Sequence, residues 1–222
     1  MKKLFKGIAS FLMYLLSKLY TYNFTCKLKL FRNAIYTLWI KNFFGDVGNH
    51  SSIDYPCSIQ GGGGKHICIG EHTHIESRCI LGCWEHYAAQ EANGLMVTQQ
   101  FNPQIEIGDY CSIGEYNHIS AINKISIGDG LLTGRYVYIG DNAHGGLSWD
   151  ESIIAPARRP LQSKGEVRIG NNVWIGDKVT ILSGVTIGDN VIIGANSVVN
   201  HDIPSNCIAA GIPARIVKTL NK

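Results

Sequence analysis

Apolar residues recur at every sixth position through most of the chain. From residue 167 onward, isoleucine follows this step, and valine keeps the same step two residues earlier. A helix cannot use this period, because six residues advance a side chain by about 600° around the helix axis. Short extended segments separated by bends can use it, with one side chain of each segment directed inward. The positions concerned are Ile169, Ile175, Ile181, Ile187 and Ile193, with Val167, Val173, Val179, Val185 and Val191.

Earlier parts of the chain show the same step. Three such segments close a triangle, so one coil takes about 18 residues, and stacked coils bury each other's faces. The small residue after most of the isoleucines lets the chain turn the corner without a Cβ clash. The sequence predicts an all-β protein, a parallel β-helix of about five coils whose exposed ends and flat faces favour capping and self-association. The earlier positions are Ile69 and Ile75; Ile107, Ile113, Ile119 and Ile125; and Ile127, Thr133 and Ile139.

Two segments interrupt the repeat and are too long for turns. They are residues 84–104 (WEHYAAQEANGLMVTQQFNPQ) and residues 145–166 (GGLSWDESIIAPARRPLQSKGE). Long excursions from a rigid scaffold are where functional sites concentrate. We therefore treat both as candidate contributors to a site.

The N-terminal residues do not follow the six-residue step. Residues 1–20 place apolar side chains at helical spacing, and residues 27–44 repeat this pattern less regularly. The uncharged stretch from residue 7 to residue 17 has 11 residues, fewer than the ~20 that a membrane span needs. The sequence thus predicts a basic amphipathic helical arm at residues 1–44 and a separate β-helix domain at residues 45–222.

Charge is distributed unevenly between arm and body. Residues 1–45 contain eight Lys or Arg and no acid, whereas the net charge of the whole chain is only +3. This pattern favours contact of the arm alone with an anionic surface, and nothing indicates a nucleic-acid binder. Three interpretations of the arm remain open: an interfacial helix on anionic lipid, helices packed on the body or on a neighbouring subunit, or a signal or anchor.

Cysteine usage bears on the compartment. The seven cysteines form no C-x-x-C pair, which suits a reducing compartment where cysteine behaves as a small buried hydrophobe. We expect a cytoplasmic protein, at the inner face of the membrane if the arm contacts lipid.

The C-terminal part of the chain carries a family resemblance. The stretch NNVWIGDKVTILSGVTIGDNVIIGANSVV, followed by DIP and AAGIPARIVK, resembles the hexapeptide-repeat acyltransferases. It is most similar to their sugar O-acetyltransferase branch, which includes galactoside and maltose acetyltransferases and those of O-antigen and capsule synthesis. The resemblance implies that residues 45–222 form a left-handed β-helix acyltransferase domain. It also implies a homotrimer with active sites between subunits, and acetyl-CoA along the groove beside the last coils.

The resemblance also implies a general base. The family's catalytic histidine opens the loop that leaves the helix before the NNVWIG coil, which here is His144 in IGDNAHGG. A neutral imidazole can remove the proton of a sugar hydroxyl as it attacks a thioester, typically gaining about 10²–10⁴-fold. Asp141 either orients the ring or bonds backbone in its own turn. Asn142 is a candidate contact with the acceptor.

Acetyl-CoA contacts are carried over by position along the tightly similar stretch. Arg215 and Lys218 would pair with the phosphates of CoA, or else are ordinary solubilising charges. Asp177 replaces a serine of the galactoside enzymes, and Asn200 with His201 replaces a Thr-Lys pair. The full set of expected cofactor contacts is Trp174, Asp177, Ala195, Asn200, His201, Arg215 and Lys218.

The other histidines are weaker candidates. His118 either faces the groove or is packed or solvated. His66, His72 and His74 invite comparison with the zinc-binding gamma-class carbonic anhydrases, which use a β-helix of this kind. Those enzymes place three ligands on consecutive coils, however, whereas two of these histidines share one segment. We therefore expect no metal requirement.

These observations predict an acetyl-CoA-dependent O-acetyltransferase acting on a sugar or lipid-linked saccharide in surface polysaccharide synthesis. One alternative is an N-acyltransferase of an amino-sugar nucleotide or a small amine, with the same fold and base. Another is a non-catalytic trimeric β-helix scaffold. His144 and the two cations near the tail argue against the scaffold, which needs neither.

Overall fold

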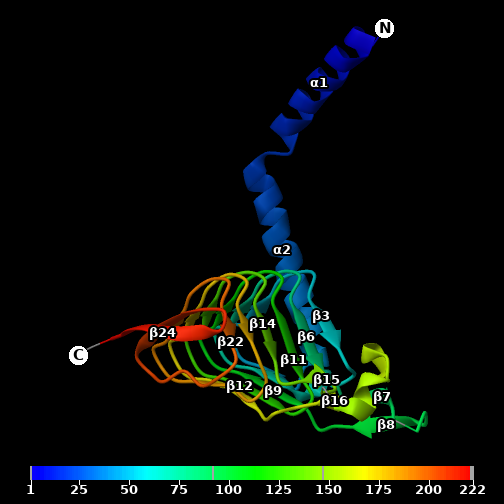
Figure 1. Cartoon of the computed structure of the whole chain (residues 1–222). Helices are drawn as coiled ribbons and strands as arrows, with labels where there is room; N and C mark the ends of the chain where they lie inside the picture. Colours follow the sequence, from blue (N-terminus) through cyan, green and yellow to red (C-terminus); the bar gives the residue numbers. More distant parts are fainter. Residues whose placement is uncertain (1, 92, 147, 221–222) are drawn as a thin grey trace.

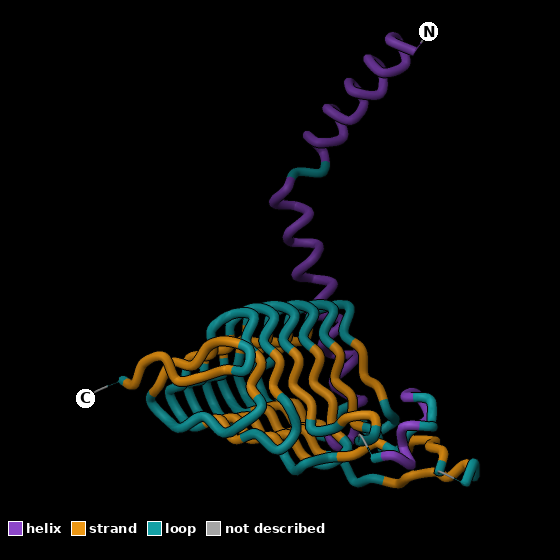
Figure 2. The backbone as a smooth tube through the Cα atoms, in the orientation of Figure 1, coloured by secondary structure: helices purple, strands orange, loops and turns teal. Residues whose placement is uncertain are grey.

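The computed structural model describes residues 2–91, 93–146 and 148–220. After two N-terminal helices, the chain forms six coils, each of which adds one strand to each of three sheets (Figure 1). Figure 2 shows the strands of successive coils stacked side by side, with loops at the corners. All strand pairs between coils are parallel. The predicted left-handed parallel β-helix is therefore confirmed.

The three sheets are named here A, B and C in chain order. Sheet A contains β1 (Asp46–Val47), β4 (Ile67–Ile69), β9 (Gln104–Ile107), β12 (Lys124–Ile127), β17 (Val167–Ile169) and β20 (Thr186–Ile187). Sheet B contains β2 (Ser52–Ile53), β5 (His74–Ile75), β10 (Ser112–Ile113), β13 (Leu132–Thr133), β18 (Trp174–Ile175) and β21 (Ile192–Ile193). Sheet C contains β3 (Ser58–Gln60), β6 (Ile80–Cys83), β11 (His118–Ala121), β14 (Tyr138–Gly140), β19 (Thr180–Ile181) and β22 (Val198–Val199).

The core consists of ladders of inward side chains, one ladder for each sheet. In sheet B, Ile53, Ile75 and Ile113 lie in register on successive coils and are fully buried. Burying one such side chain is worth about 1.5–3 kcal/mol. Thr133 continues the ladder as a polar member, and its hydroxyl accepts a hydrogen bond from the backbone N–H of Gly114 at 2.9 Å. The period-six pattern thus specifies both the core and the register.

The glycines after the isoleucines are required by the close approach of successive coils. A Cβ at Gly108 would lie 2.7 Å from the carbonyl carbon of Gly128 on the next coil. A Cβ at Gly128 would in turn lie 2.9 Å from the carbonyl carbon of Gly170. Larger residues would therefore push the coils apart at this corner.

The first coil was not predicted. About five coils were expected from residue 66 onward, whereas β1, β2 and β3 form a sixth that begins at Asp46. Its inward residues Val47, Ile53 and Ile59 keep the step of six. The glycine run at residues 61–64 and the short helix η2 (Gly64–His66) then shift the frame before β4. The six-residue step is therefore present in the first coil, but the frame shift places it out of phase with the following coils.

The arm forms two helices that differ in their contacts. Helix α1 (Lys2–Leu19) extends away from the body, and Thr21 caps the start of α2 (Tyr22–Ile40) by accepting from the Phe24 N–H at 3.2 Å. A short helix η1 (Lys41–Phe43) leads into β1. In the described part of the chain, no helix is both long enough and apolar enough to cross a membrane. Large apolar and aromatic side chains of α1 that are exposed are Phe5, Ile8, Phe11, Leu12, Met13, Tyr14, Leu15, Leu16 and Leu19.

The second half of α2 covers the open edge of the first coil. The Thr37 hydroxyl donates to the Ile53 carbonyl and accepts from the Ile53 N–H, both at 3.0 Å. The Tyr36 hydroxyl does the same for Cys57, donating at 2.8 Å and accepting at 3.0 Å. Side chains of the helix therefore take the place of a further strand at this edge. The other end finishes with β23 (Cys207–Gly211) on β21, and with β24 (Ala214–Thr219) folded back antiparallel on β23.

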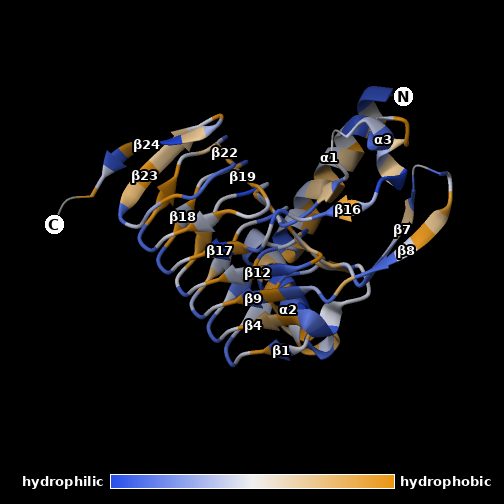
Figure 3. Ribbon diagram, turned by 60° about the horizontal axis from the view of Figure 1, so that its bottom comes forward, coloured by the Kyte–Doolittle hydropathy of each residue, from blue (hydrophilic) through white to orange (hydrophobic). Residues whose placement is uncertain are grey.

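Both inserts leave the β-helix from sheet C. The first forms a hairpin of β7 (His86–Gln90) and β8 (Met96–Gln100). The second contains β15 (Ala143–His144), α3 (Trp149–Ser152), η3 (Pro156–Arg158) and β16 (Leu161–Gln162). Figures 1 and 3 show the two inserts side by side, beyond the edge of the stacked coils. They contact each other through β7 and η3.

Candidate active site

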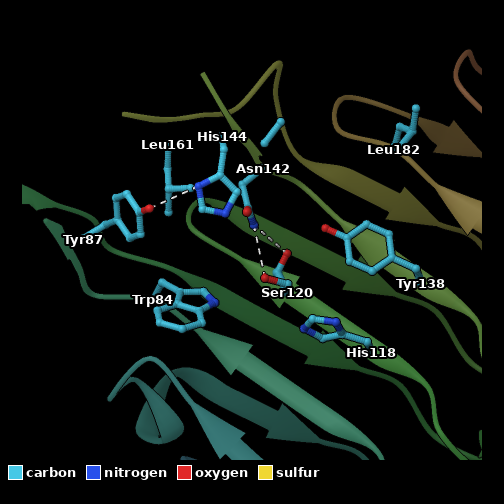
Figure 4. A pocket seen from close by; sticks show the side chains of 10 residues that line it. Trp84, Tyr87, His118, Ser120, Tyr138, Asn142, His144, Leu161 and Leu182 are labelled. Carbon is cyan, nitrogen blue, oxygen red and sulfur yellow. Dashed lines mark hydrogen bonds between the residues drawn. The ribbon is translucent and has the colours of Figure 1, made fainter. Parts of the chain in front are cut away.

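His144 lies at the base of the second insert. It is the last residue of β15, which directly follows the sheet C strand β14, and it pairs across an antiparallel ladder with Leu161 of β16. The ring nitrogen Nδ1 is 3.2 Å from the hydroxyl of Tyr87, which comes from the first insert (Figure 4). The two rings meet edge to face, with centroids 5.5 Å apart. Both inserts therefore contribute to the surroundings of His144.

A cavity of about 420 Å³ opens beside His144. Its walls come from the outward face of sheet C and from both inserts, and Figure 4 shows Trp84, Tyr138 and His118 around it. Aromatic faces and a few hydrogen-bonding groups are a lining that suits a small polar ligand with an apolar side. The lining residues are Trp84, Tyr87, His118, Ser120, Tyr138, Asn142, Ala143, His144, Leu161 and Leu182.

Asn142 faces the same cavity. Its side-chain N–H₂ donates to the carbonyl of Ser120 at 3.1 Å and lies 3.3 Å from the Ser120 hydroxyl. Ser120 is itself buried on β11. This anchoring fixes the amide on the preceding coil. The position agrees with the expected contact to an acceptor, which stays a prediction.

Asp141 occupies a buried corner. Its carboxylate accepts hydrogen bonds from the backbone N–H groups of Ile122 at 2.9 Å and Asn123 at 2.8 Å. Burial raises the pKa of Asp141, and these hydrogen bonds oppose the shift. The partner of the His144 ring in the described chain is Tyr87, not Asp141. Of the two roles considered for Asp141, the structure shows hydrogen bonds for backbone bonding. The backbone groups that the carboxylate binds belong to the preceding coil, not to its own turn.

His118 lies on the floor of the cavity. Its Nε2 is buried and has no hydrogen-bond partner within residues 2–91, 93–146 and 148–220. Burial also lowers the pKa of the ring, so His118 is neutral near pH 7. The ring meets Tyr138 edge to face at 5.4 Å. Of the two roles considered for His118, the one facing the groove agrees with this position.

Sequence reasoning did not assign Trp84, Tyr87, Ser120 or Tyr138 to the site. The repeat could have indicated the position of one of them, Tyr138. The residue before an inward isoleucine points outward, so Tyr138 must lie beside His118 in register on adjacent coils. Trp84 and Tyr87 belong to the first insert, where no repeat indicates direction.

A second cavity of about 240 Å³ lies on the other side of β15. It shares Asn142, Ala143 and Leu182 with the first, and it is also lined by Gly145 and Asn200. The backbone leading to His144 therefore separates two hollows, one of which touches an expected CoA contact.

Three of the expected CoA contacts lie together near this second cavity. The side-chain oxygen of Asn200 is 2.8 Å from Nδ1 of His201, and Nη1 of Arg215 is 3.4 Å from the same nitrogen. Lys218 is on the same strand as Arg215, opposite Ile208. All four side chains belong to the C-terminal end of the stack.

The remaining expected contacts lie elsewhere. Trp174 is on sheet B beside Leu132, and Asp177 and Ala195 are at the corner between sheets B and C. The Asp177 carboxylate accepts from the Arg135 N–H at 2.8 Å. Trp174, Ile192, Ile208 and Lys218 are successive register partners, so Trp174 and Lys218 lie in the same sheet of one chain.

The fold and the repeat place the chain in the class of left-handed hexapeptide β-helices. A family model described as bacterial transferase hexapeptide (six repeats) matches residues 166–201. The putative lipopolysaccharide biosynthesis O-acetyl transferase WbbJ of Escherichia coli is 40% identical over 121 residues, 53% of this chain and 61% of that protein. The galactoside O-acetyltransferase of the same species is 39% identical over 126 residues, 54% and 62% of the two chains. This chain spans about three fifths of the length of these curated relatives.

Solved structures agree with this placement. Galactoside acetyltransferase in complex with coenzyme A has a TM-score of 0.53 and 27% identity, covering 82% of this chain and 68% of that chain. AntD, an N-acyltransferase from Bacillus cereus in complex with dTDP and 3-hydroxybutyryl-CoA, has a TM-score of 0.62 and 24% identity, covering 82% and 86%. The second likeness shows the fold alone. The chain carries the transferase hexapeptide repeat, and its resemblance to the sugar O-acetyltransferases is confirmed.

Proposed function

We propose that the protein is an acetyl-CoA-dependent O-acetyltransferase of a saccharide hydroxyl, in surface polysaccharide synthesis. The observation that carries the proposal is that His144 lines an aromatic cavity, while its chain neighbours Ala143 and Gly145 line a second cavity that reaches Asn200. The first cavity suits a sugar ring, whose apolar face would lie on Trp84 or Tyr138 while its hydroxyls bond Ser120 and Asn142. The named activities of the relatives agree with acetyl transfer.

His144 would act as the general base. Its Nε2 takes the proton of the sugar hydroxyl while that oxygen attacks the carbonyl carbon of the thioester. The C–S bond then breaks, the acetyl group stays on the sugar oxygen, and the imidazolium returns the proton to the CoA thiolate. In His144→Ala we expect a loss of about 10²–10⁴-fold in kcat with unchanged affinity for acetyl-CoA.

An exposed apolar surface on sheet B supports the homotrimer that the family resemblance implies. Trp174 is 52% exposed and Leu132 beside it is 46% exposed, which is an apolar surface on sheet B that a neighbour would cover. Trp174→Glu should lower the molar mass measured by light scattering to that of one chain. An unchanged trimer would place the interface on another face.

Donor binding can be tested without knowing the acceptor. Calorimetric titration of acetyl-CoA should show one site per chain, weakened about tenfold or more in an Arg215→Ala, Lys218→Ala double variant that removes two phosphate-pairing cations. A charge-matched control, Lys27→Ala with Lys41→Ala, should bind like the wild type. No binding by the folded protein would contradict the proposal.

The acceptor class then needs a turnover assay. Thiol release from acetyl-CoA should be stimulated by glycosides and lipid-linked saccharides, and abolished by His144→Ala. Stimulation by amino sugars alone, with an N-acetyl product, would show that the protein is the N-acyltransferase considered above.

We further propose that helix α1 holds the enzyme at an anionic lipid surface, at the cytoplasmic face of the membrane. Its exposed apolar face is accompanied by lysines, and residues 1–45 contain no acid. Binding of such a helix combines apolar insertion with attraction to anionic headgroups. Deletion of residues 2–20 should abolish co-sedimentation with anionic vesicles and leave the oligomeric state unchanged. If the deletion changes the oligomeric state instead, α1 packs between subunits.

A further inference from the structure

Tyr87 connects His144 to the second insert. Its hydroxyl is 3.2 Å from Nδ1 of His144 and donates a hydrogen bond of 2.5 Å to the carbonyl of Ala157. A carbonyl oxygen can only accept, so the single hydroxyl proton of Tyr87 is committed to Ala157. Towards His144 the hydroxyl oxygen can therefore only accept, and the proton between the two rings must be on Nδ1. In a neutral imidazole this leaves Nε2 without a proton.

We propose that Tyr87 is a positioning residue that holds His144 in the tautomer with Nδ1 protonated and Nε2 available as the base. The inference rests on the proposed function, because only a base at Nε2 gives this tautomer a catalytic purpose. A neutral imidazole in water favours the opposite tautomer, with the proton on Nε2. Without the Tyr87 contact, most His144 rings would then present a donor where an acceptor is needed.

The position of Tyr87 is itself fixed by a closed circuit of contacts. Tyr87 pairs with Gln99 across the hairpin, and the Gln99 amide bonds both backbone groups of Leu161, accepting at 2.7 Å and donating at 3.1 Å. Leu161 pairs with His144 across β15 and β16. The contact of the Tyr87 hydroxyl with Nδ1 of His144 completes the circuit. The hairpin is thus held in register with the strand that carries His144, which places the hydroxyl opposite Nδ1.

The same circuit supplies a matched comparison. Tyr87→Phe removes two hydrogen bonds and keeps the ring, whereas Gln99→Ala removes two hydrogen bonds between the inserts without contacting His144. Loosening of the inserts would be common to both variants. A change of tautomer would be specific to Tyr87→Phe.

The experiment measures the tautomer directly, by two-dimensional NMR of imidazole nitrogens in the full-length protein. The His144 signals are assigned by their loss in His144→Ala. The wild type and Gln99→Ala should show Nδ1 protonated, and Tyr87→Phe should show a shift towards protonated Nε2. In the acetyl-transfer assay, Tyr87→Phe should lower kcat with KM for acetyl-CoA unchanged. We expect a loss of about 10–100-fold, by analogy with the removal of a hydrogen-bond partner that orients a metal-binding histidine.

Three outcomes would overturn the proposal. They are an Nε2–H tautomer in the wild type, an unaltered tautomer in Tyr87→Phe, and an equal tautomer shift in Gln99→Ala, which would assign the effect to insert packing. Failure of the proposed function looks different. If no acceptor is acetylated, the NMR signals still report whether Tyr87 sets the tautomer.

Discussion

Replacement of Asp141 by alanine tests how the corner before His144 is built. The substitution removes the carboxylate that accepts from the N–H groups of Ile122 and Asn123. Ile122 and Asp141 are buried, so water does not readily replace the acceptor of the Ile122 N–H, whereas Asn123 is exposed. A buried donor left without a partner costs about 1–3 kcal/mol, and the loss of an ordinary hydrogen bond costs about 0.5–1.5 kcal/mol. We expect Asp141→Ala to lower the free energy of unfolding by about 1.5–4.5 kcal/mol.

Asp177→Ala is the matched control. Its carboxylate also accepts a backbone N–H of the preceding coil, that of Arg135, but the side chain is exposed and makes one such bond. Water can replace that acceptor, so the expected loss is only about 0.5–1.5 kcal/mol. Urea unfolding followed by circular dichroism measures both variants.

Two results would refute this account of Asp141. One is equal destabilisation by the two substitutions, which would mean that burial of the donors does not matter. The other is an Asp141→Ala protein of unchanged stability with turnover abolished. That result would return Asp141 to the role of orienting the catalytic ring.

Three further predictions concern pH, the cover that α2 places on the first coil, and the cysteines. Burial lowers the pKa of His118, so the unfolded chain binds the proton at a higher pH than the folded chain does. Thermal stability should therefore fall as the pH drops below about 6.5, and it should fall less in His118→Gln. An equal dependence of stability on pH in the two proteins would contradict this. Thr37→Val keeps the shape but loses both bonds to Ile53 and should cost about 1–3 kcal/mol in urea unfolding; an unchanged midpoint would show that the cap contributes nothing. Burial raises the pKa of Cys79 and Cys83 to about 12, so a disulfide reagent at pH 8 should not modify them in the folded protein. Rapid loss of both thiols would show that the coils open.

The parts of the fold that the sequence revealed are those that repeat. The six-residue step fixes which side chain points inward, and stacking the coils then fixes the register, as for Ile75 and Ile113. His144 was located through the family resemblance, which places the catalytic histidine where the chain leaves the repeat before the NNVWIG coil. The first coil was missed because a glycine run shifts the frame behind Ile59.

The contacts of His144 could not be read in the same way. Tyr87 lies 57 residues away in an insert without periodicity, and its direction depends on tertiary contacts such as that between Gln99 and Leu161. Similarly, the spacing of Asp141 and His144 left two roles open for the carboxylate, orienting the ring or bonding backbone in its own turn. At the corner, the carboxylate turns inward to backbone N–H groups, because a buried N–H requires an acceptor.

The cover that α2 places on the first coil has a consequence for self-association. A β-helix is a stack whose end presents strand edges that match its opposite end, so two uncovered molecules could join end to end and grow into a fibre. Thr37 and Tyr36 close one end by occupying the groups that a further strand would bind. The folded-back strand β24 completes sheet B at the other end. We therefore expect a truncation that removes both α1 and α2 to associate end to end, because the first coil would then expose unpaired strand edges.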